Sequence, residues 1–237
     1  MPVLSYIVTA FAAYLLGSIP TGFLVGRARG IDIRTVGSGN IGATNTMRVL
    51  GRPAGILVLL VDCLKGWLAC NLGVLICIWL APNINGIRDF SSEQLSLPPL
   101  ERFAIIAGIF AVLGHNYTCW LKFKGGKGIA TTTGVYLALA PWAVLIGLIV
   151  FILAVLVTRY VSVGSIAAAI ALPVTIWVTM VSQHGSGSEM FVATDNLFLG
   201  IVTTALGALA IYKHKSNIQR LRSGTESRIT FKRKDLQ

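Results

Sequence analysis

The chain has 237 residues, of which 54% are hydrophobic and 12% charged, and its mean hydropathy is +0.74. Soluble domains carry about 25% charged residues, so this composition excludes an ordinary soluble enzyme and indicates a membrane protein. Its net charge of +11 favours cytoplasmic loops, anionic headgroups or phosphorylated substrates over nucleic acid, and no nucleic-acid partner is predicted.

Seven apolar segments are predicted to cross the bilayer. A helix rises 1.5 Å per residue, so about 20 apolar residues span roughly 30 Å of hydrocarbon. Pro141, the polar stretch 158–165 and Pro173 interrupt the long apolar region between 129 and 182, which we divide into three spans, the first of them short. The predicted spans are, in chain order, Val3–Val25, Ala54–Leu80, Phe103–Leu121, Ile129–Ala140, Trp142–Val157, Ile166–Val181 and Leu197–Tyr212.

The distribution of cations predicts the orientation of these spans. With the N-terminus outside, every Lys and Arg except Lys65, Arg88 and Arg102 falls on the inner side, as the positive-inside rule requires. No basic stretch precedes the first apolar run, so a cleavable signal peptide is not predicted. We therefore predict a single-domain (1–237), all-α integral membrane protein with about seven transmembrane helices, its N-terminus outside and its C-terminus cytoplasmic. The predicted inner segments are 27–53, 122–128, 158–165 and 213–237, and the outer loops are 82–102 and 183–196.

Two glycine-rich stretches on the inner side look like nucleotide motifs. GSGNIG at 37–42 has the spacing G-x-G-x-x-G, which binds a dinucleotide only where a strand precedes it within a βαβ unit. A transmembrane span and an Arg-rich loop precede it here, so we reject that reading. KGGKG at 124–128 is not a P-loop, because Gly128 stands where that motif needs Ser or Thr.

The polar motifs nevertheless have a common chemistry. Glycines let main-chain N–H groups approach an anion, Arg offers a planar fork to phosphate oxygens, and Lys adds a point charge. Paired carboxylates and clusters of His and Cys with ligand spacing are missing from the inner segments, so neither a metal nor another cofactor is predicted. We expect helix packing to bring together four segments: VGSGNIGATNTMRVLGR, GHNYTCWLKFKGGKGIATTTG, RYVSVGS and YKHKSNIQRLRSGTE.

Three of these motifs carry a family resemblance. GSGNIGATN at 37–45 is followed by Arg48, GHN at 114–116 leads to KGGKG, and HKxNIxRL at 214–221 is followed by Glu226. Together they resemble the bacterial membrane acyltransferases that use acyl phosphate and glycerol 3-phosphate. The resemblance implies an active site at the cytoplasmic face of the bacterial inner (plasma) membrane. It implies transfer of a fatty acyl group from acyl phosphate to the 1-hydroxyl of glycerol 3-phosphate, giving lysophosphatidic acid and phosphate, the first acylation of phospholipid synthesis.

The resemblance also implies roles for individual residues. The partners it implies are glycerol 3-phosphate, acyl phosphate and membrane lipid. Catalytic or phosphate-holding roles fall on Ser38, Arg48, His214 and Asn217. Substrate-binding roles fall on Gly37, Gly39, Asn40, Gly42, Thr44, Asn45, His115, Gly125, Gly126, Lys127, Gly128, Arg220 and Glu226, together with Ser162 or Ser165, between which the sequence does not decide.

Several alternatives stay open at this point. The proton of the attacking hydroxyl could go to His214 or to a substrate phosphate oxygen. Asp62 and Lys65, one turn apart inside the second span, are expected to pair with each other, with a share in the site as the alternative. His115 could hydrogen-bond across the bundle or belong to the site.

Two other protein classes share parts of this pattern. A transporter would show repeat symmetry and broken helices that meet at the midplane of the membrane, whereas no internal repeat is found in the sequence and the polar motifs lie at one surface. A lipid-binding scaffold would need the basic tail but not the Ser, Asn and Gly motifs.

Overall fold

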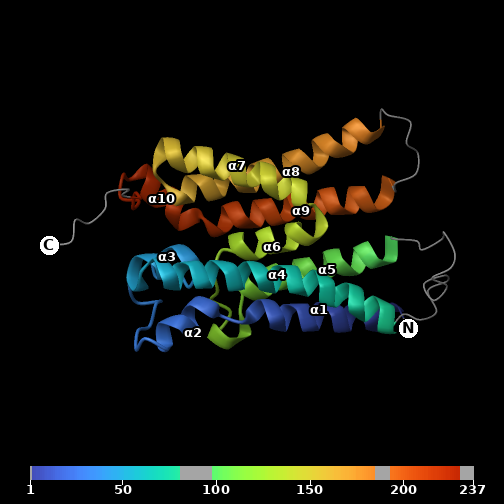
Figure 1. Cartoon of the computed structure of the whole chain (residues 1–237), viewed down its shortest axis with the longest axis horizontal. Helices are drawn as coiled ribbons and strands as arrows, with labels where there is room; N and C mark the ends of the chain where they lie inside the picture. The colour runs from blue at the N-terminus through green and yellow to red at the C-terminus, as the bar shows by residue number, and fades with distance from the viewer. Residues whose placement is uncertain (1, 81–97, 185–192, 230–237) are drawn as a thin grey trace.

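The computed structural model describes residues 2–80, 98–184 and 193–229, and every regular element within them is a helix (Figure 1). Several connections are tight: a single residue separates α3 from α4, α6 from α7 and α9 from α10, and two residues separate α1 from α2 and α7 from α8. The elements are α1 (Pro2–Ser18), α2 (Thr21–Arg27), α3 (Ala43–Leu50), α4 (Arg52–Leu80), α5 (Pro98–Asn116), the 3-10 turn η1 (Cys119–Leu121), α6 (Ile129–Leu139), α7 (Pro141–Thr158), α8 (Val161–His184), α9 (Ala193–Lys213) and α10 (Lys215–Arg222).

Each predicted span corresponds to a helix, with three differences at the ends. The first span is broken into α1 and α2 around Pro20, which has no N–H to continue the helix. Helix α8 begins at Val161, so most of the predicted loop 158–165 is the start of a helix. The predicted segments 27–53 and 213–237 contain the short helices α3 and α10. Most of the predicted outer loops 82–102 and 183–196 lies outside the described residues.

The membrane class of the fold is confirmed. Five helical stretches are long and apolar enough to cross a bilayer, and α9 with α10 makes a sixth if this pair, bent by 51°, is counted as one span. Helix α6 is a shorter apolar helix. The number of crossings and the side on which the termini lie remain predictions.

The helices pack in two groups that lie side by side (Figure 1). Helices α4 and α5 contact each other, and each of them contacts α1 and α6, while α8 packs between α7 and α9. The groups meet where α6 contacts α7 and α5 contacts α9. Between α6 and α9, the Tyr136 hydroxyl donates a hydrogen bond of 2.6 Å to Thr203 Oγ1. This buried bond fixes one group against the other.

Glycines bring α4 and α6 into backbone contact. A methyl group on Gly134 would lie 1.8 Å from the Cys63 carbonyl oxygen, and one on Gly66 would lie 2.2 Å from that of Thr131. Lipid is as apolar as a Leu side chain, so helices in a membrane associate through such close packing. The two glycines thus hold α6, and the loop before it, against α4.

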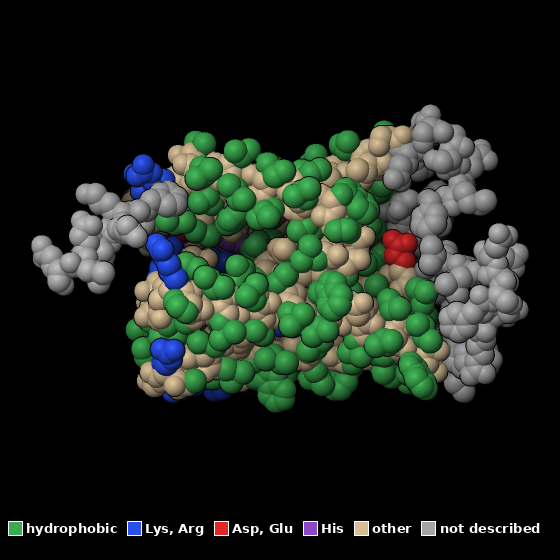
Figure 2. Space-filling model, in the orientation of Figure 1, with side chains coloured by type: hydrophobic (Ala, Val, Ile, Leu, Met, Phe, Trp, Pro, Cys, Tyr) green, Lys and Arg blue, Asp and Glu red, His purple; other side chains and the backbone are tan. Residues whose placement is uncertain are grey.

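The two ends of the bundle differ in charge. Helices α2, α3 and α10 lie at the same end, which we call the basic end (Figure 1). Figure 2 shows Lys and Arg gathered there on the visible face, acidic side chains at the opposite end, and a flank of hydrophobic side chains between. Leu60, Leu145 and Val157 are among the exposed apolar residues. This surface suits a bilayer around the flank, with the basic end in water.

Replacing Gly134 with Ala should lower the thermal midpoint of unfolding in detergent. The added methyl group clashes with the α4 backbone, and such overpacking costs about 1–3 kcal/mol. Gly147→Ala is the matched control, because nothing lies within 4 Å of the added methyl group. Equal midpoints for the two variants would contradict the α4–α6 contact.

Candidate active site

A pocket of about 800 Å³, counting its open mouth, lies at the basic end. It takes residues from α3 to α8, α10 and the tail. All predicted site residues line it except Gly37, Gly39, Gly125, Gly126 and Arg220. Those that do line it are Ser38, Asn40, Gly42, Thr44, Asn45, Arg48, His115, Lys127, Gly128, Ser162, Ser165, His214, Asn217 and Glu226.

Four helices begin at this pocket. Ala43 starts α3, Ile129 starts α6 and Val161 starts α8, and all three residues line the pocket, as does Asn217 in the first turn of α10. The first N–H groups of a helix have no partner inside it, and the helix dipole makes this end positive. Helix starts are therefore ready sites for phosphate, and four of them face one pocket here.

The glycine motif at 37–42 works differently from the expected open cradle. The N–H of Ser38 donates to Asn45 Oδ1 at 2.7 Å, and that of Gly42 donates to Asn40 Oδ1 at 2.9 Å. The N–H of Gly39 is bonded to the Val36 carbonyl. Since these donors are occupied within the loop, the unpaired donors come mainly from the helix starts.

Asn45 shapes the same loop. Its buried amide nitrogen lies 2.9–3.1 Å from the carbonyl oxygens of Ile33, Val36 and Asn40. Gly37, with φ of +62°, passes so close that a methyl group would lie 2.3 Å from Asn45 Oδ1. Asn45 thus lines the pocket, but its side-chain amide forms hydrogen bonds with the loop that carries Ser38.

A chain of polar contacts connects the 125–128 loop to the tail. Lys127 Nζ donates to Asn217 Oδ1, and Asn217 Nδ2 donates to Glu226 Oε1 at 2.7 Å. Arg220 Nε donates to the other Glu226 oxygen at 2.6 Å. Arg220 therefore lies outside the pocket and acts on it by holding Glu226.

The charges that face the pocket leave an excess of positive charge. Its two carboxylates already have cation partners: Asp62 lies 2.8 Å from Lys65 Nζ, and Glu226 pairs with Arg220. Arg48 lines the pocket and forms no ion pair with a described residue. Arg48 and Lys127 are thus the cations left for a bound anion.

Burial changes the protonation of two pocket residues. It lowers the pKa of Lys127 to about 8, with the Glu226 charge opposing the shift and Arg220 and Arg48 adding to it. Burial, and then the Lys127 charge, lowers the pKa of His214 to about 4. Neutral His214 donates from Nδ1 to the Ala210 carbonyl oxygen at 2.7 Å, because that oxygen can only accept. Its Nε2 is therefore left as an acceptor.

Both serines at the start of α8 line the pocket, so the structure does not choose between them. Both are buried. The Ser162 hydroxyl also helps to lower the pKa of Glu226, so it lies beside a carboxylate of the same pocket.

Sequence reasoning left out the apolar wall of the pocket and gave Asp62 only a minor alternative role. Leu59 and Phe151 line the pocket from α4 and α7, and Asp62 lines it from α4. The expected pair of Asp62 with Lys65 is confirmed. A charged residue inside a predicted span was the signal for Asp62, whereas Leu59 and Phe151 differ in no way from other lipid-span residues in the sequence.

Comparison with known proteins decides the family. A family model described as glycerol-3-phosphate acyltransferase matches residues 7–224. The chain belongs to this family. The acyltransferase is 44% identical over 229 residues to the glycerol-3-phosphate acyltransferase of Geotalea daltonii, covering 97% of this chain and 99% of that one. It is 41% identical to that of Chlorobaculum parvum, covering 98% and 99%.

Two solved structures are similar to the acyltransferase. Both are crystal structures of PlsY (YgiH), described as an integral membrane glycerol 3-phosphate acyltransferase, in a glycerol 3-phosphate form and a lysophosphatidic acid form. The TM-scores are 0.74 and 0.72 at 35% and 33% identity, and each match covers 95% of this chain and 96% of the other.

Affinity for glycerol 3-phosphate should fall as the pH rises above about 8. A Lys with a lowered pKa carries its charge fully below that pKa and loses it above. The phosphate itself ionises near pH 6, so it does not change between pH 7 and 10. We expect kcat/KM for glycerol 3-phosphate to fall by up to about tenfold per pH unit above 8. The Lys127→Arg variant, whose side chain stays charged, should not show this decline. A flat profile in the parent enzyme would contradict the role of the Lys127 charge.

Proposed function

We propose that the acyltransferase uses acyl phosphate as donor and acylates the 1-hydroxyl of glycerol 3-phosphate, giving lysophosphatidic acid and inorganic phosphate. This would be the first acylation in phospholipid synthesis. One observation carries the proposal: two cations without a carboxylate partner among the described residues, together with four helix starts, face a single pocket, which suits two phosphate-bearing reactants. The ligand forms named for PlsY support the acceptor and the product.

The proposed reaction needs alignment more than activation. The hydroxyl oxygen attacks the carbonyl carbon of the acyl phosphate, a mixed anhydride, and the bond from that carbon to the phosphate oxygen breaks. The hydroxyl proton leaves with the phosphate or passes to a side chain. Lys127 and Arg48 would hold the two phosphates, and the Ser38 and Ser162 hydroxyls would bind oxygens of the reacting groups. Preorganised donors of this kind stabilise charge on the carbonyl and on the departing phosphate.

We propose that the hydroxyl proton goes to a phosphate oxygen rather than to His214. A base with a pKa of about 4 removes a proton less readily than a phosphate dianion, whose pKa is near 6. His214 Nε2 is an acceptor and would instead orient the hydroxyl. A phosphate group of a substrate, rather than a protein side chain, would thus act as the base.

The proposed location follows from the two surfaces around the pocket. Its open mouth lies at the basic end, which we assign to the cytoplasmic side of the bacterial inner membrane by the positive-inside rule. Leu59 and Phe151 form part of its apolar wall toward α4 and α7. An acyl chain would lie against these side chains while glycerol 3-phosphate arrives from water.

The purified enzyme in detergent should convert glycerol 3-phosphate and palmitoyl phosphate to lysophosphatidate without coenzyme A or added divalent metal. Lys127→Ala and Ser38→Ala should each lower kcat/KM by about 100-fold or more, because each removes a group at the reacting centre. Lys124→Ala is the matched control, since Lys124 is exposed on the same loop and lies outside the pocket. Activity with palmitoyl-coenzyme A and none with palmitoyl phosphate would overturn the donor assignment.

His214→Gln should lower turnover much less than the loss of a general base would. An amide can still orient a hydroxyl, so we expect kcat to fall by about 10-fold, whereas loss of a general base costs about 100- to 10,000-fold. Single-turnover rates across pH 6 to 9 measure the difference. A larger loss that added imidazole restores would assign the base to His214 after all.

A further inference from the structure

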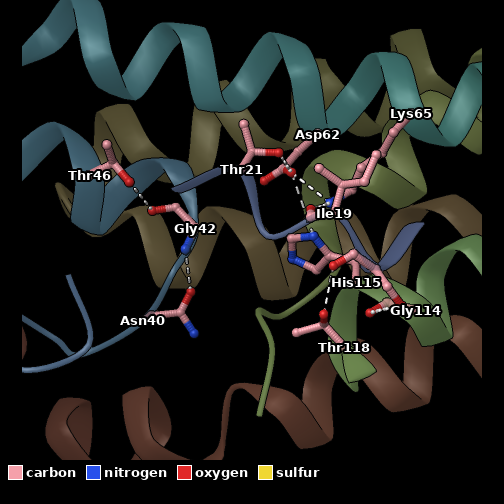
Figure 3. A network of polar contacts seen from close by, with 11 residues as sticks. Ile19, Thr21, Asn40, Gly42, Thr46, Asp62, Lys65, Gly114, His115 and Thr118 are labelled. Carbon is pink, nitrogen blue, oxygen red and sulfur yellow. Dashed lines mark hydrogen bonds and ion pairs between the residues drawn. The ribbon is translucent and has the colours of Figure 1, made fainter. Parts of the chain in front are cut away.

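Three ionisable side chains have no part in the proposed chemistry: Asp62 and His115, which line the pocket, and Lys65 beside them. Asp62, Lys65 and His115 are only 2–5% exposed, and they lie close together in Figure 3. Lys65 Nζ is 2.8 Å from Asp62 Oδ1, and the Thr21 hydroxyl donates to the same oxygen at 2.9 Å. Charged groups this deep in a membrane protein are costly, so they call for a specific role.

Part of that role is to close the break between α1 and α2. Lys65 Nζ donates to the Ile19 carbonyl at 2.9 Å, and the Thr118 hydroxyl donates to that of Ser18 at 2.6 Å. A broken helix frees carbonyls that water cannot reach inside a bilayer, and these donors satisfy two of them. The break explains Lys65 and Thr118, but it does not explain His115.

His115 is wedged between this ion pair and the loop that carries Lys127. On one side its Nδ1 lies 3.8 Å from Asp62 Oδ1, too far for a hydrogen bond, and it has no partner among the described residues. On the other side, a methyl group on Gly126 would lie 2.0 Å from Nε2. The Gly126 N–H also donates to the His115 carbonyl at 3.0 Å. The ring therefore fills the space between Asp62 and the turn directly before Lys127.

The neighbouring contacts hold the same turn from below. The Gly125 N–H donates to the Asn116 carbonyl at 3.2 Å, and Lys213 Nζ donates to that carbonyl at 3.0 Å. A methyl group on Gly125 would lie 2.0 Å from the His115 carbonyl oxygen. The turn thus packs against the end of α5 without room for a side chain. The His115 ring determines how closely Gly126 approaches this helix end.

We propose that His115 is a positioning residue for glycerol 3-phosphate, and that the Asp62–Lys65 pair keeps its ring in place. The ring supports Gly126, Gly126 fixes Lys127, and Lys127 holds the substrate phosphate. The last step rests on the function proposed above, while the contact between His115 and Gly126 does not. With the phosphate of glycerol 3-phosphate assigned to Lys127, the network would act on the binding of the acceptor rather than on that of the donor.

An exchange of side-chain size between the two positions tests this contact. Gly126→Ala forces the turn off the ring, so KM for glycerol 3-phosphate should rise at least about tenfold. His115→Ala removes the support and should raise the same KM about 3- to 10-fold. The added methyl has room once the ring is gone, so His115→Ala with Gly126→Ala should bind glycerol 3-phosphate at least about threefold better than Gly126→Ala alone. Contacting residues show such coupling in double-mutant cycles.

Two readouts separate positioning from general damage. KM for palmitoyl phosphate should stay within about twofold in all three variants, because a loosened fold would affect both substrates. Gly147→Ala, with nothing near its added methyl, should leave both KM values unchanged. Where His115→Ala does not fold, His115→Asn, which also shortens the side chain, takes its place in the cycle.

Different results would contradict the positioning role of His115 and the proposed acyl donor. The positioning role would be refuted if Gly126→Ala raised the KM for glycerol 3-phosphate by the same factor with and without His115. It would also be refuted if His115→Ala left that KM unchanged. If the parent enzyme does not turn over palmitoyl phosphate, the proposed donor fails instead. Equilibrium dialysis of radiolabelled glycerol 3-phosphate against the same four proteins then gives the cycle in dissociation constants, with the same expected order.

Discussion

The hydrogen bond from Lys127 to Asn217 is the contact on which the pocket depends. It joins the loop before α6, in one group of helices, to α10, at the end of the other. Glu226 and Arg220 extend it into the tail. Because the lysine pairs with a neutral amide and both pocket carboxylates have other cation partners, this closure leaves positive charge for an anionic substrate.

The membrane explains why the polar groups gather as they do. A bilayer offers no water to backbone or charged groups in its core, so each must find a partner inside the protein. Lys65 does this at the α1–α2 break. Outside the bilayer core, the buried Asn45 amide likewise binds the carbonyls of the 33–40 loop at the basic end. At the pocket, by contrast, four helices begin, and their first N–H groups have no partner inside the helix.

The sequence predicted the helical segments well because an apolar run of about 20 residues has few other stable structures. It also placed Ser38, Arg48, Lys127 and His214 near one another, since their motifs share one side of the predicted topology. It could not predict that α8 begins at Val161, because polar residues in a first helical turn look like a loop. The glycines of KGGKG were explained by anion access, whereas Gly125 and Gly126 fit the turn against α5, a packing contact that spacing alone does not reveal.

A crystal structure of this enzyme with glycerol 3-phosphate bound tests the central claim most directly. The account predicts phosphate density within hydrogen-bond distance of Lys127 Nζ and of the first N–H groups of a helix that begins at the pocket, with the 1-hydroxyl directed toward His214. Phosphate bound away from Lys127, or bound only by the 37–42 loop, would contradict it.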